Sequence, residues 1–326
     1  MGYNVYVTRA IPEDGLERLR RECEIVEVNP EDRALTRAEL LEKVRGRDGV
    51  LTMLTDIIDE ELMRAAKGVR GFANLAVGYN NFDVAKATAL GLVLTNTPGV
   101  LTDATADLAW ALLFSMARRI AECDRFVRAG KFTGWGPMMF LGADITGRTL
   151  GIVGAGRIGT AVALKSRGFN MKILYCDPVT NETLERELGA RRVGLNQLLA
   201  EADFVSVHVP LLESTRRLFG ADQFRRMKRT AIFINTARGP IHDEAALVEA
   251  LRSRQIAGAG LDVYEDEPQW HPGLAVLDNV VLLPHIGSAT IGTRSRMAIM
   301  AAENLLAIVK GLRAPNCINP EVYEGK

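Results

Sequence analysis

Short apolar runs alternate with amphipathic segments along this 326-residue chain. Most of the runs lack the period-two alternation of a half-buried strand, so we interpret them as strands covered on both faces. Such strands, alternating with helices, predict parallel sheets and a doubly wound α/β fold. The predicted strands are Val5–Thr8, Val50–Met53, Phe72–Ala76, Leu92–Thr95, Thr149–Val153, Lys172–Tyr175, Phe204–Val207, Ala231–Ile234, Ala259–Val263 and Val280–Leu283.

Two long helical patterns suggest how these units are grouped. The first begins at a capping Thr102 and runs to about Ile120, and the second spans about Thr290–Lys310. We expect the second helix to cross back and complete the first domain, which leaves a cleft between two Rossmann or flavodoxin-like lobes. The predicted domains are a discontinuous substrate-binding lid domain, 1–98 plus 288–326, and a dinucleotide-binding domain, 99–287.

Composition excludes several classes of protein. Forty basic residues balance forty acidic ones, which argues against a broad basic face for nucleic acid. The four cysteines form no C-x-x-C pair and do not cluster with histidine, so we expect reduced thiols in a cytoplasmic protein and no metal site. We expect no signal peptide, and no apolar stretch approaches the roughly 20 residues that span a bilayer.

A glycine-rich turn follows the predicted strand Thr149–Val153. It has the spacing G-x-G-x-x-G and leads into a helical pattern. Gly154 allows the tight turn, Gly156 lets a pyrophosphate approach the backbone, and Gly159 lets the helix pack on the strand. The pyrophosphate then lies at the helix N-terminus, where Arg157 can add a charge-assisted contact. A turn that merely connects two elements is the alternative.

An acidic residue at the end of the next strand strengthens this interpretation. Asp177 lies about 20 residues downstream, where a carboxylate accepts both ribose hydroxyls and repels a 2′-phosphate. No arginine follows immediately to bind such a phosphate. The pattern therefore favours NAD as the cofactor, with NADP disfavoured.

Three polar side chains at later strand ends suit reduction of a 2-keto acid. Arg238 offers a planar fork for a carboxylate, His285 can give and take a proton, and Glu267 can orient that histidine. Parallel strands bring their carboxyl ends to one edge of a sheet, so we expect the three to converge. His208 is the rival proton donor, and His242 is expected in a polar loop.

These motifs resemble those of the D-isomer-specific 2-hydroxyacid dehydrogenases over essentially the whole chain. The resemblance rests on Leu150–Gly159, Asn235–Gly239, Gly260–Val263 with Glu267-Pro268, and Pro284–Ser288. It implies Arg238 as substrate anchor, His285 as acid/base and Glu267 as its partner, usually in a homodimer. The remaining expected cofactor-binding residues are Ile158, Val209, Pro210, Thr215, Thr236, Ala237, Asp262, Gly287 and Thr105.

Within that family the chain is most similar to glyoxylate/hydroxypyruvate reductases. The matching segments are Leu75–Tyr79, Asn81–Val84, Asn96–Leu108 and Phe140–Gly142. The resemblance implies that Leu75, Val77 and Gly78 belong to the substrate site, with backbone N–H groups near Val77 and Gly78 on the carboxylate. It also implies that Trp135 lines the pocket of a neighbouring subunit, with a plain interface role as the alternative.

Departures from relatives narrow the function. Several NADP-using relatives have Ser-Arg-Thr where this chain has Asp177–Val179, and Met139 replaces a tryptophan of some reductases. Val77 stands where phosphite-oxidising relatives have lysine, and formate dehydrogenases have glutamine for Glu267. We therefore expect NADH-dependent reduction of glyoxylate or hydroxypyruvate to D-2-hydroxy acids. The alternatives are another keto acid (pyruvate, phenylpyruvate or phosphohydroxypyruvate) and a NAD-sensing corepressor.

Overall fold

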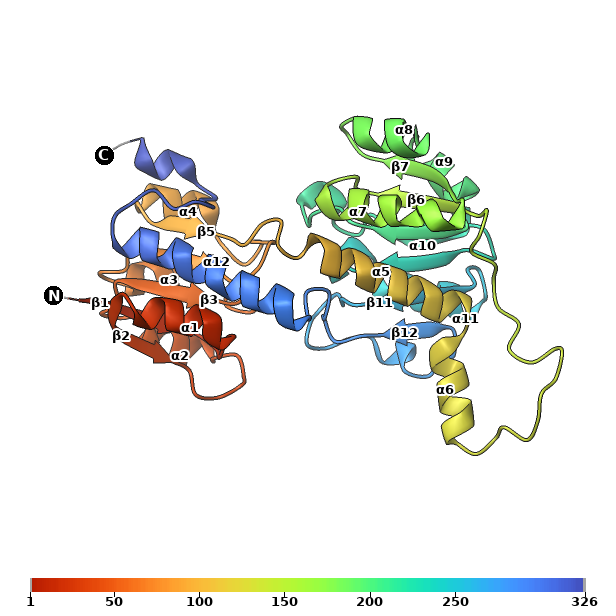
Figure 1. The fold of residues 1–326 in the computed structure, drawn as a ribbon, viewed down its shortest axis with the longest axis horizontal. Helices are drawn as coiled ribbons and strands as arrows, with labels where there is room; N and C mark the ends of the chain where they lie inside the picture. Colours follow the sequence, from red (N-terminus) through yellow and green to blue (C-terminus); the bar gives the residue numbers. More distant parts are fainter. Residues whose placement is uncertain (1, 325–326) are drawn as a thin grey trace. The chain divides into compact units, whose positions relative to one another are not determined.

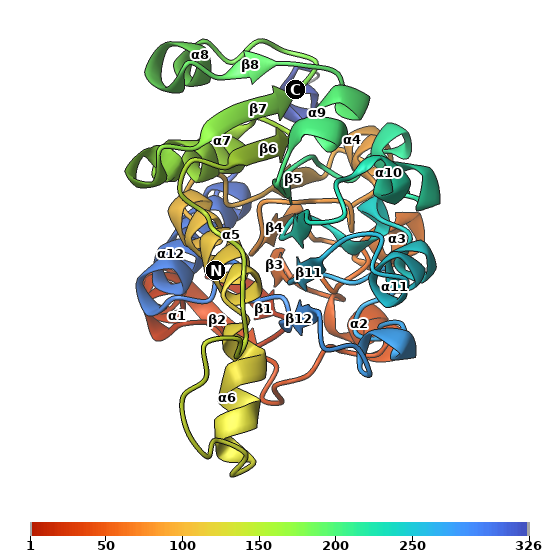
Figure 2. The ribbon, with the colours of Figure 1, turned by 90° about the vertical axis from the view of Figure 1, so that its right-hand side faces the viewer.

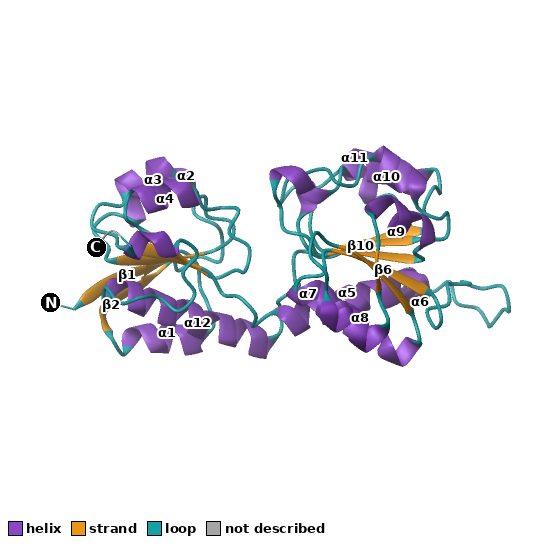
Figure 3. Ribbon diagram, turned by 90° about the horizontal axis from the view of Figure 1, so that it is seen from above, coloured by secondary structure: helices purple, strands orange, loops and turns teal. Residues whose placement is uncertain are grey.

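The structure, a computed structural model, describes residues 2–324 and divides them into two compact units (Figure 1). Unit 1 holds the residues up to Leu101 and those from Ser288 onward, and unit 2 is Thr102–Gly287. Each unit contains one parallel sheet with helices on both faces, drawn in orange and purple in Figure 3. The predicted α/β fold with two doubly wound sheets is confirmed.

Unit 1 has a five-stranded sheet in the order β2-β1-β3-β4-β5. Its side chains are buried alternately on the two faces: Val5 and Val7 pack toward one face, and Tyr6 between them packs toward the other. The strands are β1 Tyr3–Val7, β2 Cys23–Val28, β3 Gly49–Thr52, β4 Gly71–Asn74 and β5 Val93–Thr95. The helices are α1 Glu13–Arg20, α2 Arg37–Lys43, α3 Glu60–Ala65, α4 Val84–Ala89, α12 Ile291–Val309 and the 3₁₀ turn η5 Pro320–Tyr323.

The long helix α12 returns the chain to unit 1 after unit 2 is complete. Thr290 caps its N-terminus by accepting a hydrogen bond from the backbone of Thr293. Met297, Ala301 and Leu305 repeat at helical spacing and are buried in the core that also contains α1 and β1. The helix predicted over Thr290–Lys310 is therefore confirmed.

Unit 2 has a seven-stranded sheet in the order β12-β11-β10-β9-β6-β7-β8. The strand order reverses between β6 and β9, the position at which doubly wound sheets bind ligands. The strands are β6 Thr149–Val153, β7 Lys172–Cys176, β8 Arg191–Arg192, β9 Phe204–Val207, β10 Ile232–Asn235, β11 Gly258–Leu261 and β12 Val280–Leu282. The helices are α5 Thr102–Ala117, α6 Ile120–Arg128, α7 Arg157–Lys165, α8 Glu182–Leu188, α9 Leu195–Glu201, α10 Ala221–Arg226 and α11 Glu244–Arg252, with 3₁₀ turns η1 Ser166–Phe169, η2 Glu213–Thr215, η3 Gly239–Ile241 and η4 Pro272–Leu274.

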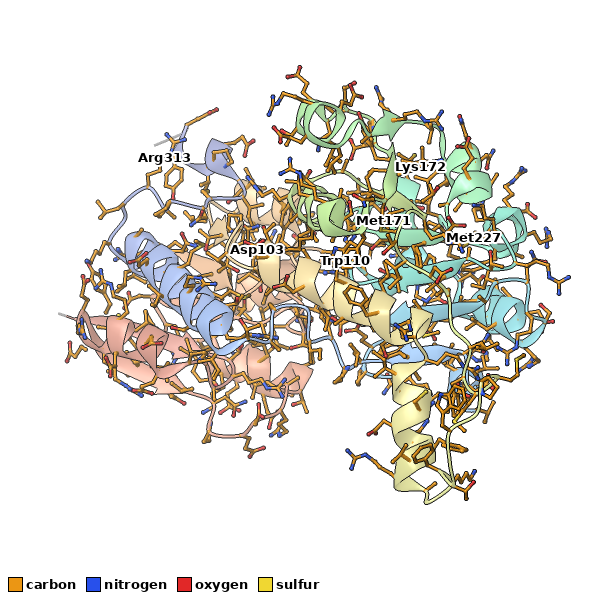
Figure 4. The ribbon with its side chains drawn as sticks, turned by 45° about the vertical axis from the view of Figure 1, so that its right-hand side comes forward. Asp103, Trp110, Met171, Lys172, Met227 and Arg313 are labelled. Atoms are coloured by element: carbon orange, nitrogen blue, oxygen red, sulfur yellow. The ribbon has the colours of Figure 1, made fainter. Side chains whose placement is uncertain are left out.

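Helix α5 packs against the sheet through a largely apolar surface. Trp110, labelled in Figure 4, stacks on Phe169 with ring centroids 5.3 Å apart and donates from Nε1 to the carbonyl of Val162. The expectation that this helix reaches Ile120 is wrong. Arg119 adopts a left-handed φ of 54°, so α5 ends at Ala117 and the chain turns into α6.

Helix α6 and the loop after it extend away from the sheet of unit 2 (Figures 1 and 2). No residue of α6 is buried. The loop carries a series of exposed apolar side chains, Phe132, Trp135, Met138 and Leu141. We call α6 and the loop to Leu141 the arm.

Strand register brings the ends of the strands in unit 2 to one edge. Val153 of β6 pairs with Cys176 of β7 and Val207 of β9. Asn235 of β10 pairs with Val207 on one side and Leu261 of β11 on the other. The segments that follow these residues carry the glycine turn, the ribose-binding candidate and the predicted catalytic groups. Their alignment follows from the parallel register alone.

Candidate active site

The glycine turn after β6 is built by three glycines with different surroundings. Gly154 has φ +93°, and a Cβ there would lie 2.6 Å from the backbone nitrogen of Val209. A Cβ on Gly159 would lie 2.0 Å from the carbonyl oxygen of Gly154. A Cβ on Gly156 would meet nothing within 4 Å. Gly154 and Gly159 are needed for packing, whereas the space at Gly156 is open to a ligand.

The start of α7 supplies donors for that ligand. The backbone N–H groups of Arg157, Ile158 and Gly159 lie in its first turn, where an α-helix has no acceptor of its own. The positive end of the helix dipole adds to their attraction for an anion. Next to the turn, Thr215 Oγ1 donates to the carbonyl of Pro210 at 2.6 Å and closes the loop that begins at Val209. This donor set fits a pyrophosphate.

Asp177 lies at the end of β7 beside the glycine turn. Its Oδ2 accepts a 2.8 Å hydrogen bond from the backbone of Ala155, and Oδ1 accepts one of 2.9 Å from Val179. Two residues outside the predicted site support this corner. Asn181 donates from Nδ2 to the carbonyl of Ala155 at 2.8 Å, and Arg192 donates from Nε to the carbonyl of Asp177 at 2.9 Å. Arg192 lies far along the chain, so spacing alone did not reveal it.

The side chains of His285 and Glu267 form a direct pair. Nδ1 of His285 lies 2.7 Å from Oε2 of Glu267, and Oε1 accepts a 3.0 Å hydrogen bond from the backbone of Tyr264. Burial acts to raise the pKa of Glu267, but the hydrogen bond and charge of His285 outweigh it, so the net pKa is lowered. His285 itself has φ +56°, a strained conformation of the kind found at functional sites.

A buried carboxylate holds the residues after His285. Asp262 is fully buried and accepts hydrogen bonds from the backbone of Ile286 at 2.7 Å and of Gly287 at 2.8 Å. Burial raises the pKa of Asp262. Thr105 donates from Oγ1 to the carbonyl of Gly287 at 3.2 Å. Three of the predicted cofactor-binding residues, Thr105, Asp262 and Gly287, therefore form one network beside the histidine.

Arg238 follows β10 and lies at the same edge. Its Nη1 donates to the carbonyl of Ala237 at 2.7 Å. Burial lowers the pKa of this guanidinium, and the charge of Glu267 opposes the shift. Asn235 holds the turn by donating from Nδ2 to the carbonyl of Arg238 at 2.9 Å and accepting from the backbone of Ala237 at 2.9 Å. An arginine remains protonated in such a setting, so Arg238 presents a cation in a half-buried position.

A buried hydroxyl after β10 lacks a hydrogen-bond partner among residues 2–324. Thr236, just after β10, is 7 % exposed, and its Oγ1 makes no hydrogen bond to any described residue. A buried polar atom of this kind costs free energy unless a ligand satisfies it. Together with the open space at Gly156, it fits a bound dinucleotide.

Two further histidines of unit 2, His208 and His242, have pKa values lowered by burial. His208 shares a 2.8 Å contact with Ser206 Oγ through Nε2, and burial lowers its pKa to about 3. A neutral imidazole is a poor proton donor at neutral pH, which weakens His208 as the rival acid. His242 does lie in a connecting segment, between η3 and α11, but the expectation that its surroundings are polar is wrong. It is fully buried, its Nδ1 lies 3.0 Å from Nδ2 of Asn235, and burial lowers its pKa to about 4.

The predicted substrate residues of unit 1 lie on a loop after β4. The carbonyl of Val77 accepts a 2.8 Å hydrogen bond from Nδ2 of Asn96, and the carbonyl of Gly78 accepts one of 3.2 Å from Nδ2 of Asn74. These contacts fix the two peptide groups. The side chain of Leu75 is instead buried in the core of unit 1.

Within residues 2–324, no group of three or more histidine, cysteine, aspartate and glutamate side chains could hold a metal ion. None of the helices in the same range is both long and apolar enough to cross a membrane.

Unit 2 has a glycine turn suited to a nucleotide at the switch point of its sheet, and a paired histidine and carboxylate lie at the same edge. This combination is typical of dinucleotide-dependent dehydrogenases. Residues 110–287 match the family described as D-isomer specific 2-hydroxyacid dehydrogenase, NAD binding domain. The chain belongs to this family of NAD(P)-binding oxidoreductases, which confirms the resemblance of its motifs.

Full-length relatives agree with that assignment. The chain is 52% identical over 322 residues to a glyoxylate reductase of Korarchaeum cryptofilum, covering 98% of this chain and 97% of the relative. It is 51% identical over 324 residues to a glyoxylate reductase of Thermococcus kodakarensis, with coverage of 98% and 97%.

Solved structures of relatives share the fold over the full length. The TT0316 protein of Thermus thermophilus is 44% identical, with a TM-score of 0.90 and coverage of 97% of this chain and 99% of that one. An NADPH-dependent glyoxylate/hydroxypyruvate reductase of Sinorhizobium meliloti, in complex with NADP and malonate, is 33% identical, with a TM-score of 0.86 and coverage of 99% and 98%.

Proposed function

We propose that the chain reduces glyoxylate and hydroxypyruvate to the corresponding 2-hydroxy acids of the D series, with NADH as the reductant. The glyoxylate reductases to which it is about half identical support the substrate class. The observation that carries the chemistry is the 2.7 Å contact between His285 and Glu267 at the edge that bears the glycine turn. It supplies an oriented proton donor where a dinucleotide can bind.

The proposed roles follow from the chemistry of each side chain. Arg238 binds the substrate carboxylate through its planar fork and polarises the keto group. Glu267 holds the proton on Nδ1 of His285, so Nε2 is the atom that delivers a proton to the substrate oxygen. NADH, when bound, supplies the hydride to C2. In unit 1 we assign Leu75, Val77 and Gly78 to substrate binding, through the N–H groups of Val77 and Gly78.

The dinucleotide is assigned to unit 2. Besides the three glycines and Asp177, the proposed contacts come from Arg157, Ile158, Val209, Pro210, Thr215, Thr236, Ala237, Asp262, Gly287 and Thr105. We propose NADH in preference to NADPH because the Asp177 carboxylate would repel a 2′-phosphate. Arg192 beside it tempers this preference, since it is a cation within the same corner.

Single substitutions test the proposed roles of His285 as proton donor and Arg238 as substrate anchor. Replacing His285 by Gln, or Arg238 by Gln, should reduce kcat/KM for glyoxylate by about 10² to 10⁴. Binding of NADH, followed by fluorescence titration, should persist in both variants. Full turnover by either variant would end the proposal, and so would NADH binding by the natural chain without turnover of any keto acid.

A substrate panel separates the proposed activity from its nearest alternative. The measurement is kcat/KM for glyoxylate, hydroxypyruvate, pyruvate and phenylpyruvate, each with NADH and NADPH. The proposal requires glyoxylate or hydroxypyruvate with NADH to be the best combination. A larger value for pyruvate or phenylpyruvate would reassign the enzyme to another 2-keto acid while leaving the mechanism intact.

We also propose that the chain acts as a homodimer that pairs through the arm. Trp135 is 83 % exposed and Met138 is 78 % exposed, an arrangement that is costly in water for an isolated chain. A cavity of about 560 Å³ lies at the base of the arm, lined by residues of α5, α6 and the strand β12. A second copy of the arm is the occupant that the proposal assigns to this surface, with Trp135 near the partner's substrate pocket.

Sedimentation of the natural chain and of Trp135→Ala tests the dimer. The natural chain should sediment as a dimer and the variant should dissociate more readily. A monomer at micromolar concentration would contradict the proposal.

We propose that the enzyme works in the cytoplasm, because its four cysteines are free thiols.

A further inference from the structure

A buried glutamate outside the proposed catalytic set bridges the loop that carries Glu267. Glu244 is the first residue of α11 and is 4 % exposed. Its Oε1 accepts a 2.6 Å hydrogen bond from the backbone of Glu265, and its Oε2 accepts one of 2.7 Å from the backbone of His271. Glu267 lies between these two anchor points. One carboxylate therefore ties together both ends of a seven-residue loop.

We propose that Glu244 is a positioning residue that holds Glu267 against His285 by bridging the backbone of Glu265 and His271. This inference rests on the proposed acid/base function of His285 and extends it to a residue that touches neither substrate nor cofactor.

The bridge depends on both oxygens of the Glu244 side chain. Two separate N–H donors need two acceptor oxygens, which a carboxylate has and a side-chain amide lacks. A glutamine at position 244 would keep one hydrogen bond and turn its own NH₂ group toward the other N–H. Hydrogen bonds to a charged acceptor are also about twice as strong as neutral ones. Glu244→Gln therefore removes one link with almost no change in side-chain volume.

The acidic side chains next to Glu244 face a cation of their own, Arg217. The neighbouring Glu265 forms a 2.8 Å ion pair with Arg217, and Asp243 lies 3.8 Å from the same guanidinium. The backbone N–H of Glu244 also donates to Oε2 of Glu265 at 3.3 Å. The contacts between α11 and the loop are thus reciprocal.

The loop also contacts the turn that carries Arg238. A Cβ placed on Gly239 would lie only 1.7 Å from the carbonyl oxygen of Tyr264, so the two backbones touch. Glu267 in turn accepts from the backbone of Tyr264. A shift of the loop would therefore displace Glu267 relative to His285. Misplacement of a catalytic group by about 1 Å can cost on the order of 10²-fold in rate.

The first experiment compares Glu244→Gln with Glu249→Gln, an exposed position on the same helix. We expect Glu244→Gln to lower kcat for glyoxylate about tenfold, within the range set by misplacement of a catalytic group, without raising KM for NADH. Glu249→Gln should leave both constants unchanged. Hydrogen–deuterium exchange should be faster in the 264–271 segment of the Glu244 variant and unaltered in the strands.

A double-substitution cycle shows whether the effect passes through Glu267. If it does, Glu244→Gln should cost little or nothing further in a Glu267→Gln background. An equal loss in both backgrounds would overturn the proposal, because Glu244 would then act independently of Glu267. An unchanged kcat in the single Glu244 variant would overturn it as well.

A backbone substitution tests the same bridge without touching Glu244, in case that variant folds poorly. His271 has φ −65°, which proline adopts without strain. His271→Pro removes the N–H that Glu244 accepts, whereas His271→Ala keeps it. We expect kcat of the proline variant to be several-fold below that of the alanine variant, and equal values would contradict the bridge.

The outcomes also distinguish this inference from the proposed function. Loss of turnover in His285→Gln with full turnover in Glu244→Gln refutes only the bridge. Full turnover in His285→Gln refutes the proposed function, and faster exchange in the 264–271 segment would then show a structural bridge without a catalytic role.

Discussion

Nδ1 of His285 lies 2.7 Å from Oε2 of Glu267, although 18 residues separate the two along the chain. A carboxylate accepts hydrogen bonds and does not donate them when ionised, so it keeps a proton on Nδ1 and leaves Nε2 for the substrate. The neighbouring strand end contributes Asp262, which holds the backbone after His285 through Ile286 and Gly287. The imidazole is therefore oriented from two sides.

Removal of the charge on Glu267 should lower catalysis. We expect Glu267→Gln to reduce kcat for glyoxylate reduction by about 10² or less, because the orientation survives in part while the electrostatic support of the imidazolium is lost. The pKa of Glu267 is lowered from its ordinary value of 4.5. Its ionised form is thus fully present above about pH 4.5, and its contribution is lost only as the pH falls through the lower folded-state value.

The pH profile of kcat provides the check. The natural enzyme should show no loss of rate from Glu267 between pH 7 and pH 5. Glu267→Gln should be slower throughout that range. A loss of rate in the natural enzyme that begins near pH 6 and is absent from the variant would contradict the lowered pKa.

Replacing Thr236 should change NADH affinity and the free energy of unfolding in opposite directions. We expect Thr236→Val to weaken NADH binding about fivefold, because one hydrogen bond contributes roughly 1 kcal/mol. In the absence of NADH the same change should raise the free energy of unfolding by about 1 kcal/mol, since the buried Oγ1 has no partner among the described residues. Titration of protein fluorescence with NADH and urea denaturation measure the two effects.

Thr97→Val is the matched control for that substitution. Like Thr236, Thr97 is buried and its Oγ1 has no partner among the described residues, but Thr97 belongs to unit 1. It should raise stability without changing the Kd for NADH. Equal NADH affinity of Thr236→Val and the natural chain would remove Thr236 from the cofactor site.

His242 should make the fold sensitive to acid. Burial lowers its pKa to about 4, so the folded state keeps the imidazole neutral while the unfolded state protonates below about pH 6.5. Stability is therefore lost as the pH falls from 6.5 toward 4. Between pH 7.5 and pH 5 this residue should cost about 2 kcal/mol of unfolding free energy.

Two substitutions at His242 isolate this effect. Asn places an acceptor near the position of Nδ1, opposite Nδ2 of Asn235, and Leu does not. Both variants should lose less stability between pH 7.5 and pH 5 than the natural chain does. Only His242→Leu should raise KM for glyoxylate, because Asn235 holds the turn of Arg238. An unaltered pH dependence in His242→Asn would contradict burial of the neutral imidazole.

Features that depend on neighbouring residues could be predicted from the sequence. The glycine turn, its flanking strand and helix, and the cap at Thr290 follow from local spacing. Parallel register then brings the strand ends together, which is why Glu267 and His285 could be placed at one edge from the sequence alone. Two strands escaped prediction. The edge strand Cys23–Val28 contains exposed Glu24, and the two residues of β8 are both exposed, so neither has an apolar run.

Contacts between distant side chains could not be predicted in this way. Glu244 looks like an ordinary acidic residue in the first turn of a helix, yet its partner His271 is 27 residues away. Arg119, whose left-handed φ follows the end of α5, likewise makes a contact far along the chain: its guanidinium lies over the ring of Phe140, 5.0 Å from the centroid. Such pairings arise from the tertiary fold and leave no periodic signal.

The corner formed by Asp177 and Arg192 should set the choice between NADH and NADPH. Asp177→Asn keeps one acceptor oxygen, which can serve the backbone N–H of Ala155, and loses the acceptor for Val179. It also removes the charge that repels a 2′-phosphate. We expect the ratio of kcat/KM for NADH to that for NADPH to fall at least tenfold, equivalent to about 1.4 kcal/mol of discrimination. Steady-state kinetics with each nucleotide at saturating glyoxylate measures the ratio.

Arg192 supplies the complementary test, because its Nε donates to the carbonyl of Asp177 and its guanidinium is a cation in the same corner. In the Asp177→Asn background, Arg192→Ala should remove most of the gained activity with NADPH and change that with NADH by less than about twofold, since only the 2′-phosphate adds a charge for it to bind. Higher salt should weaken NADPH use by the Asn variant for the same reason. If Arg192→Ala lowered both activities equally, the arginine would serve only to fold the loop, and discrimination would rest on Asp177 alone.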